Sequence, residues 1–315
     1  MSETVLKAAM ISKKYKRLMP YALDWKTVYA LDKVNIEIHQ GDIYGFVGAN
    51  GSGKTTFIRI LAGLVQQTAG EIELFGEKNQ KNLYQQRRFI NGIIENPALD
   101  PALTAQDNLE VCRLQQGNCD KSRIGEVLEL AGLLEADIKD LKVKHFSLGM
   151  KQRLGIAKAL LSNPKFLFLD EPLNGLDPAG IKDFRTLIRM LHENGITILI
   201  SSHLLNELDS LATCYGFLHK GKMIEQISAE ALAQKRNRYM LLRVDKVPQA
   251  EEVLHEVFNI SNYQVISNDT IHLYEQLDQK GQLMKAFVIN DINVEEMTEQ
   301  GEGLEAYYMS LIRKK

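Results

Sequence analysis

The chain has 315 residues, a length that suits one large domain and a smaller one better than a single core. Hydrophobic residues make up 45% and charged residues 25%, the balance of a folded protein that buries a core without disulfides or metals. The 38 Lys and Arg residues against 40 Asp and Glu give a net charge of -2. This balance supplies no general positive field for a phosphate backbone, so nucleic acid is not expected as a partner.

Neither the cysteines nor the apolar runs indicate a secreted or membrane-spanning chain. Cys112, Cys119 and Cys214 have no zinc-site or disulfide spacing, so we expect reduced thiols. The N-terminus lacks the apolar stretch of a signal peptide. The longest apolar runs, 166–169 and 196–200, fall far short of the roughly 20 residues that a spanning helix needs. We therefore expect neither a signal peptide nor a transmembrane segment.

Up to about residue 230, short apolar runs alternate with helical patterns, which is typical of an α/β domain with a largely parallel sheet. In chain order, the pattern predicts a strand and turn at 41–48, a helix at 54–64 and a second helix at 124–134. A buried strand at 166–169, a helix at 181–191 and another buried strand at 196–200 follow.

Polar and basic residues at 234–238 indicate a junction between two domains. Beyond it, we expect strands at 239–244 and 270–273 and helices at 250–258 and 304–312. The predicted organisation is a nucleotide-binding domain at 1–230 and a small accessory or regulatory α+β domain at 236–315.

A complete phosphate-binding motif lies between the first predicted strand and helix. Residues 48–56, Gly-Ala-Asn-Gly-Ser-Gly-Lys-Thr-Thr, match G-x-x-x-x-G-K-[ST]. Small residues let backbone N–H groups converge on phosphate oxygens at a helix N-terminus. We expect Lys54 to reach the β- and γ-phosphates and the Thr55 hydroxyl to bind Mg²⁺. The predicted nucleotide contacts are Asn50, Gly51, Ser52, Gly53, Lys54, Thr55 and Thr56.

Two acids and a histidine follow the later buried strands. Asp170 ends the strand predicted at 166–169, at the edge where parallel sheets bind ligands, so we expect it to hold Mg²⁺. Glu171 is positioned to take a proton from an attacking water molecule. His203 closes the next predicted strand, where it could donate to the γ-phosphate.

Residues 146–157 resemble the signature of the ATP-binding cassette (ABC) family, Leu-Ser-Gly-Gly-Gln-x-Gln-Arg. Ser147, Gly149, Gln152 and Arg153 match, whereas Phe146, Leu148 and Met150 depart from it. The resemblance covers about residues 5–230, with the motifs in family order. It implies a P-loop NTPase cassette with a mainly parallel sheet, N-terminal antiparallel strands and a helical signature subdomain at about 96–160, followed by the small C-terminal α+β domain.

The resemblance also implies roles that need a second copy of the chain. Two cassettes would pair head to tail, with each ATP between the phosphate loop of one and Ser147 and Gly149 of the other. Asp177 resembles the D-loop residue that communicates between the two sites. Tyr15 resembles the aromatic residue that stacks on adenine, with Tyr21, Trp25 and Tyr29 as rivals.

One position departs from the family more seriously. Glu95 stands where the Q-loop glutamine is usual, and as a carboxylate it could contact Mg²⁺ or the attacking water. The Ile-Ile-Glu-x-Pro pattern around it is similar to the subgroup that exports bacitracin and lantibiotics. Residues 96–109 are then expected to face a membrane partner.

We therefore predict an ATP-hydrolysing subunit with ATP and Mg²⁺ as cofactors. It would form an ATP-dependent homodimer and power a separate polytopic permease at the cytoplasmic face of the membrane. Peptide antibiotics or other amphipathic drugs are the expected cargo. The alternative is a soluble mechanical ATPase of the same family. Against it, relatives in translation carry two cassettes and those in DNA repair insert long coiled coils, and neither feature is present.

Overall fold

The computed structural model describes residues 3–19, 24–117, 120–135, 138, 140–236, 239–301 and 303–313. Cys119, Tyr21 and the junction residues Asn237 and Arg238 lie outside these ranges, as does the side chain of Trp25. The chain divides into two compact units, Met1–Ala229 and Glu230–Lys315. Each has its own hydrophobic core.

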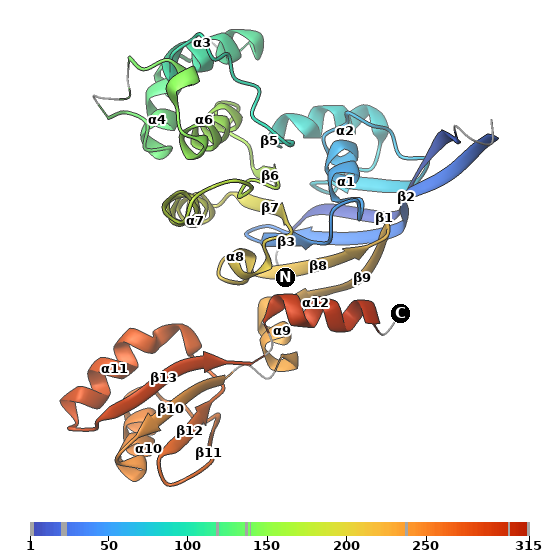
Figure 1. Cartoon of the computed structure of the whole chain (residues 1–315). Helices are drawn as coiled ribbons and strands as arrows, with labels where there is room; N and C mark the ends of the chain where they lie inside the picture. The colour runs from blue at the N-terminus through green and yellow to red at the C-terminus, as the bar shows by residue number, and fades with distance from the viewer. Residues whose placement is uncertain are drawn as a thin grey trace. The chain divides into compact units, whose positions relative to one another are not determined.

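A six-stranded sheet forms the centre of the first unit, in the order β5-β6-β7-β3-β8-β9 (Figure 1). Its pairs are parallel except for β8–β9, so the predicted mainly parallel sheet is confirmed. Every residue of β3 and β6 is buried, which explains why both appear in the sequence as uninterrupted apolar runs. The strands are β3 (Ile43–Val47), β5 (Ile90–Ile93), β6 (Phe166–Asp170), β7 (Thr197–Ser202), β8 (Cys214–His219) and β9 (Lys222–Ser228).

A second sheet is antiparallel, in the order β2-β1-β4, and confirms the predicted N-terminal strands. Its strands are β1 (Thr4–Met19), β2 (Asp24–His39) and β4 (Ala69–Leu74). Helix α1 (Lys54–Leu61) packs between the two sheets, because Phe57 belongs to the same buried cluster as Leu6 of β1 and Phe46 of β3. This packing fixes the N-terminus of α1 at the end of β3.

The helical subdomain lies beyond the β5 edge of the central sheet (Figure 1). Its α6 packs on β5 and also contacts α3 and α4. The predicted helical signature subdomain is therefore confirmed. Its helices are α3 (Ala105–Gln115), α4 (Ser122–Leu130), the short η2 (Val143–His145) and α6 (Leu148–Leu160). The remaining helices of this unit are α2 (Gln80–Gln86), η1 (Arg87–Phe89), α7 (Pro178–Glu193) and α8 (Leu205–Asp209), and α9 (Ala229–Lys235) begins at the unit boundary.

The second unit is the predicted small α+β domain. Its strands and two long helices follow the order βαββαβ, and its antiparallel sheet has the order β11-β12-β10-β13. A buried cluster that includes Met240, Leu254 and Phe287 lies between the sheet and the helices. The elements are β10 (Tyr239–Val244), α10 (Val247–Glu256), β11 (Tyr263–Val265), β12 (Thr270–Leu273), η3 (Leu277–Gln279), α11 (Lys280–Ile289), β13 (Val294–Gln300) and α12 (Leu304–Arg313).

Several predicted helix bounds were wrong by a few residues. The helix after the phosphate loop ends at Leu61 rather than at residue 64, because Ala62 forms its C-cap. The signature helix begins at Leu148, and Ser147 caps it. Within the described parts of the chain, no helix is both long and apolar enough to cross a membrane.

Candidate ATP-binding site

The phosphate loop joins β3 to the N-terminus of α1, and its shape depends on two glycines. Gly53 has φ +114°, in the left-handed region, and a Cβ there would lie 2.4 Å from the carbonyl oxygen of Ala30. A Cβ on Gly48 would lie 2.5 Å from both the Leu218 carbonyl and the Ser52 hydroxyl. The loop can therefore take this close turn only with glycine at both positions.

Lys54 is held inside the loop by contacts on two sides. Its side chain is only 5% exposed, and its Nζ donates a 2.6 Å hydrogen bond to the Gly48 carbonyl. The same Nζ lies 2.9 Å from Oε1 of Glu171. Lys54 is thus already paired with Glu171, the second of the two acids predicted at the end of the strand.

The two acids leave the end of β6 in different directions. Asp170, 1% exposed, accepts a 2.5 Å hydrogen bond from the Ser201 hydroxyl on neighbouring β7. Glu171 has φ +50°, an unusual value for a residue with a side chain. Its backbone N–H donates to both the carbonyl oxygen and the hydroxyl of Ser201, at 3.1 and 2.9 Å. Ser201 therefore holds the turn that separates the two carboxylates.

His203 joins the same group of side chains. Its Nδ1 lies 2.8 Å from Oε2 of Glu171, and its backbone N–H donates to that oxygen at 3.2 Å. Since Oε1 faces Lys54, Glu171 connects the lysine of the loop to the histidine. The structure thus brings together Lys54, Asp170, Glu171 and His203 from three strand ends, as the topology of a parallel sheet requires.

A cavity of about 180 Å³ lies over the loop and is lined by loop residues, Glu171 and Ala30. All seven predicted loop contacts, Asn50 through Thr56, belong to this lining. Ser52 is buried, and its hydroxyl has no hydrogen-bond partner in the described structure. That unsatisfied group, the glycine turn and the lysine suit phosphate oxygens, and the oxygens of Thr55 and Asp170 are the donor type that Mg²⁺ prefers.

The signature residues lie elsewhere on the same unit. Ser147 caps α6 by accepting a 3.2 Å hydrogen bond from the Met150 N–H, and Asp177 caps α7 by accepting from Gly180 at 2.9 Å. Ser147, Gly149 and Asp177 line one cavity of about 180 Å³, together with Arg153. None of them lines the loop cavity, so the structure does not bring the signature to the phosphate loop of its own chain.

Comparison with known proteins identifies the family in which these motifs occur together. The family model for ABC transporters matches residues 31–174. The bacitracin transport ATP-binding protein BcrA of Bacillus licheniformis is 45% identical over 284 residues, 90% of this chain and 92% of that protein. The chain belongs to the ABC transporter family. It is an ATP-binding, ATP-hydrolysing cassette, and the family prediction from the sequence is confirmed.

Another relative and a solved structure are also named as ATP-binding proteins. The lantibiotic transport ATP-binding protein SrtF of Streptococcus pyogenes is 44% identical over 215 residues, 67% of this chain and 91% of that one. Among solved structures, the dimeric post-hydrolysis form of the ATP-binding cassette MJ0796, bound to ADP and Pi, matches with a TM-score of 0.62 and 27% identity. That match covers 71% of this chain and 98% of that chain.

Glu95 and Tyr15 of the ABC cassette do not line the loop cavity. Glu95 has φ +62° and is 62% exposed, and it pairs with Arg59 at 2.6 Å. No contact between Glu95 and either Thr55 or Asp170 is present among the described residues. Tyr15 lies in β1 opposite Val28 of β2 and is 42% exposed, but it does not line the loop cavity. The roles predicted for both residues stay predictions.

The rivals of Tyr15 in the ABC cassette are only partly described. Tyr29 pairs in register with Lys14, so it lies on the opposite face of the β1–β2 ribbon from Tyr15. Ala30, the residue after Tyr29, does line the loop cavity. Tyr29 precedes Ala30 and Tyr15 is opposite Val28, so register alone does not decide which tyrosine would stack on adenine.

Ser201 is the site residue that sequence reasoning missed. It appears in the sequence only as the first of two serines before His203. The available signal was a polar side chain inside an otherwise apolar buried strand, because such a group needs a hydrogen-bond partner. Its partner, Asp170, is its register neighbour across the parallel β6–β7 pair.

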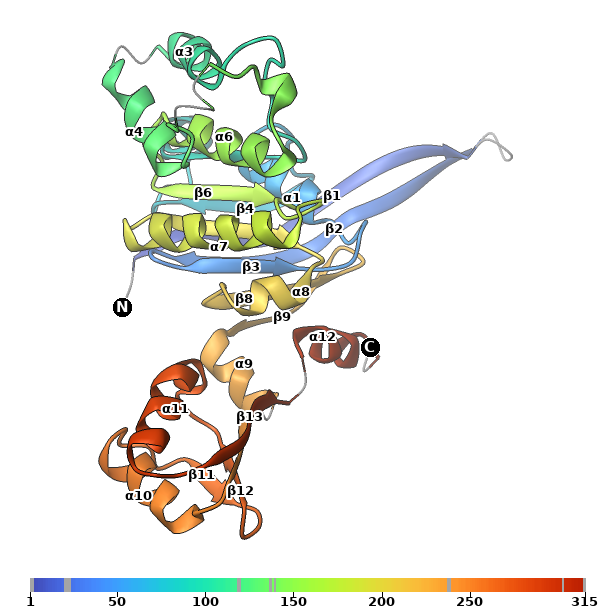
Figure 2. The ribbon, with the colours of Figure 1, turned by 60° about the vertical axis from the view of Figure 1, so that its left-hand side comes forward.

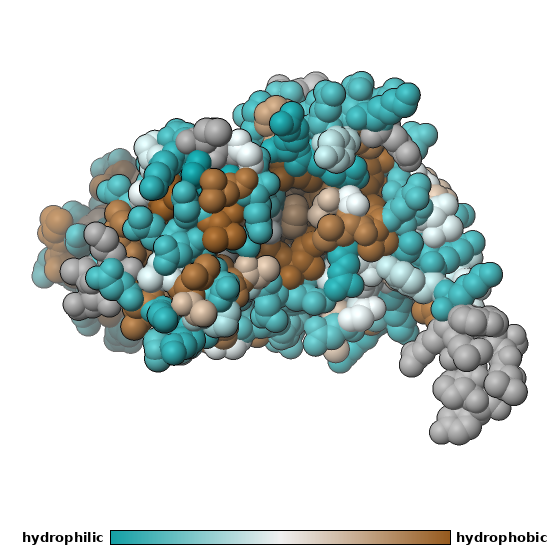
Figure 3. Space-filling view, turned by 90° about the horizontal axis from the view of Figure 1, so that it is seen from above, coloured by the Kyte–Doolittle hydropathy of each residue, from teal (hydrophilic) through white to brown (hydrophobic). Residues whose placement is uncertain are grey.

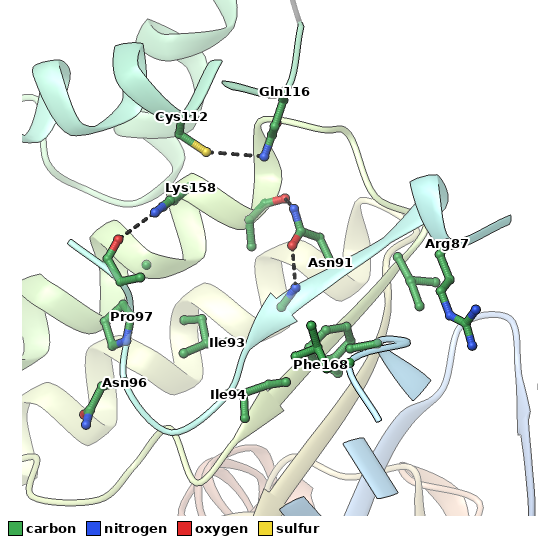
Figure 4. A pocket seen from close by; sticks show the side chains of 17 residues that line it. Arg87, Asn91, Ile93, Ile94, Asn96, Pro97, Cys112, Gln116, Lys158 and Phe168 are labelled. Atoms are coloured by element: carbon green, nitrogen blue, oxygen red, sulfur yellow. Dashed lines mark hydrogen bonds between the residues drawn. The ribbon is translucent and has the colours of Figure 1, made fainter. Parts of the chain in front are cut away.

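A second hollow of the ABC cassette lies between β5 and the helical subdomain. Its volume is about 390 Å³, and its lining includes Ile93, Ile94, Pro97 and Phe168. In Figure 3, apolar side chains gather in a hollow in the middle of the face seen from above. Figure 4 shows Cys112 of α3, Lys158 of α6 and the segment from β5 to Pro97 around this groove. Lys158 closes one side by donating to the Ala98 carbonyl at 2.6 Å.

Proposed function

We propose that two copies of this chain pair head to tail around two ATP molecules and drive a separate polytopic permease. One observation carries the proposal: Ser147 and Gly149 lie at the start of α6, in a cavity separate from the loop cavity. A helix N-terminus attracts a phosphate, so the signature of one copy can complete the loop of another. A single chain then holds both halves of a site that it cannot assemble alone.

At each completed site, Lys54 would bind the β- and γ-phosphates, and Glu171 would accept a proton from the attacking water. His203, already bonded to Glu171, would donate toward the γ-phosphate as charge develops there. Mg²⁺, held by Thr55 and Asp170, would neutralise charge on the phosphate oxygens. When a phosphate takes over Lys54, Oε1 of Glu171 is freed for the water.

The relatives indicate cargo and location. Proteins named for bacitracin transport and lantibiotic transport are 45% and 44% identical to this chain over the aligned residues, so we propose export of peptide antibiotics or similar amphipathic drugs. The apolar groove beside residues 96–98 is proposed to receive a segment of the permease. The cassette would then lie peripherally at the cytoplasmic face of the membrane.

The first test is ATP turnover with Mg²⁺ in wild type and Glu171→Gln, with size-exclusion chromatography in ATP. Loss of the proton acceptor should lower turnover by about 10²- to 10⁴-fold and leave an ATP-locked dimer that wild type does not accumulate. Glu193→Gln, at the exposed end of α7, is the matched control and should behave as wild type. A Glu171→Gln protein that stays monomeric and hydrolyses normally would refute the catalytic assignment.

The groove is tested by Ala98→Arg, which adds a bulky cation to its exposed rim. The measurement is co-purification with a candidate polytopic permease co-expressed with this chain. We expect that association to be lost, while the turnover of the isolated cassette is unchanged because Ala98 does not line the loop cavity. Normal co-purification of the variant would remove the groove from the proposed interface.

A further inference from the structure

Strands β1 and β2 pair with each other well beyond the end of β4, the third strand of their sheet. β1 pairs with β4 only from Leu6 to Ser12, and from Lys13 to Met19 its register partner in the described structure is β2 alone. We call this two-stranded ribbon, residues 13–19 and 24–31, the arm. Figure 2 shows it projecting away from the rest of the cassette. A ribbon of two strands is marginally stable in water, so a projecting arm is expected to be kept for contact with something else.

The charge of the arm is opposite to that of the chain. Residues 13–31 contain five basic side chains against the single acid Asp24, while the whole chain has a net charge of -2. The basic residues are Lys13, Lys14, Lys16, Arg17 and Lys26. Two of the basic residues occupy facing positions of the ribbon, because Arg17 is the register partner of Lys26. Lysine and arginine concentrated in this way on a projecting element attract an anionic surface.

Aromatic residues are interleaved with the basic ones. Tyr15 and Tyr29 are 42% and 48% exposed, and the Nζ atoms of Lys13 and Lys14 lie 5.1 and 4.9 Å from the centres of these two rings. The only tryptophan of the chain, Trp25, is the register partner of Leu18 farther along the arm. Tyrosine, tryptophan and basic residues together are the composition that proteins place at the interface between a bilayer and water.

We propose that the arm binds the anionic lipid surface of the membrane. The presence of a membrane near the cassette depends on the proposed function, in which the cassette lies beneath a permease. The lipid contact is argued from the charge and composition of the arm. A basic residue near an anionic bilayer strengthens binding by about fivefold, and the effect weakens as salt is added. The basic residues from Lys16 onward are proposed to meet the headgroups.

The test uses the full chain and vesicles of phosphatidylcholine, with or without phosphatidylglycerol. We expect sedimentation only with the anionic vesicles, together with a blue shift of Trp25 fluorescence, and both should decline with salt. The variant Lys16→Gln/Arg17→Gln/Lys26→Gln should bind on the order of 100-fold more weakly. The matched control, Lys81→Gln/Lys121→Gln/Lys285→Gln, removes three exposed lysines outside the arm and should bind as wild type does.

The proposal would be overturned by equal binding to both kinds of vesicle, by unchanged binding of the arm variant, or by vesicle binding without any change in Trp25 fluorescence. An arm that ignores vesicles and binds a single-stranded RNA oligonucleotide would also overturn it. ATP turnover is measured in parallel and should be unchanged in the arm variant. Absence of turnover in wild type would count against the proposed ATPase mechanism and not against the arm.

Discussion

Ser201 connects the two carboxylates of the site through one hydroxyl group. The hydroxyl donates to Asp170 at 2.5 Å and accepts from the Glu171 N–H at 2.9 Å. It thereby fixes the oxygen of Asp170 that faces β7 and supports the left-handed conformation of Glu171. A buried, charge-assisted hydrogen bond of this kind is typically stronger than a neutral one.

Ser201→Ala should therefore lower kcat and raise the Mg²⁺ concentration needed for half-maximal turnover. A hydrogen bond to a charged group is worth about 1.5–3 kcal/mol, which corresponds to roughly a 10- to 150-fold loss of rate. Ser201→Thr retains the hydroxyl and should recover most of the rate. If Ser201→Ala changed only thermal stability and left the Mg²⁺ dependence unchanged, Ser201 would have a structural role alone.

At the scale of single elements, Ser147 and Asp177 cap α6 and α7 and also line the cavity that contains the signature residue Gly149. Asp177 caps α7, so Asp177→Ala should cost about 1 kcal/mol of unfolding free energy, whereas Asp177→Asn preserves the cap. If the carboxylate acts between two cassettes, both variants should lose turnover. Urea denaturation and ATPase assays separate these effects.

Thr104 provides the control for that pair, because it caps α3 in the same way, by accepting from the Asp107 N–H. Thr104→Ala should lose similar stability with normal turnover. Should Asp177→Asn hydrolyse ATP at the wild-type rate, Asp177 would be a helix cap and nothing more.

Elements with one clear pattern could be predicted from the sequence. The strands at 239–244 and 270–273 were predicted with correct bounds, because alternate residues are buried. Helix α11 was missed, since Gly281 lies in its first turn and apolar residues occupy several of its sides. The N-terminal antiparallel strands were predicted only through the family resemblance, because register shifts interrupt the alternation of the long β1–β2 ribbon, as between Lys13 and Lys14.

The candidate site likewise contains residues that the sequence could indicate and contacts that it could not. Lys54 and Asp170 could be placed at the candidate site because each lies in a short local pattern, Lys54 in the phosphate loop and Asp170 at the end of a buried strand. The contacts of Ser201 depend on the parallel register of β6 and β7, and the pair Glu95–Arg59 joins residues 36 positions apart. Such pairings depend on tertiary structure, which a single sequence does not show.

At the scale of the whole molecule, the chain contains two separate cores. One cluster draws its residues from Val5 to Leu218, and the other from Met240 to Met297. Separate cores commonly unfold in separate transitions. The loop cavity belongs to the first unit alone, so bound nucleotide should stabilise only that unit.

Calorimetry of Glu171→Gln, in which turnover cannot deplete the ligand, should show two transitions. ATP with Mg²⁺ at about 100 times its Kd should add about 2.7 kcal/mol to the unfolding free energy of one of them. The other transition should not move. A single transition, or an equal shift of both, would show that the units unfold together.

The contact between Lys54 and Glu171 has a consequence for how tightly ATP is held. The lysine is already neutralised by an internal counter-ion, so an arriving phosphate replaces one anion by another and does not meet a bare cation. Displacing Glu171 therefore offsets part of the attraction between Lys54 and the phosphate. The affinity for nucleotide depends on how much more strongly Lys54 attracts the phosphate than the Glu171 carboxylate. On the proposed mechanism, the same exchange would couple nucleotide binding to a movement of the Glu171 side chain, so its carboxylate would be free for proton transfer only when the phosphate has arrived.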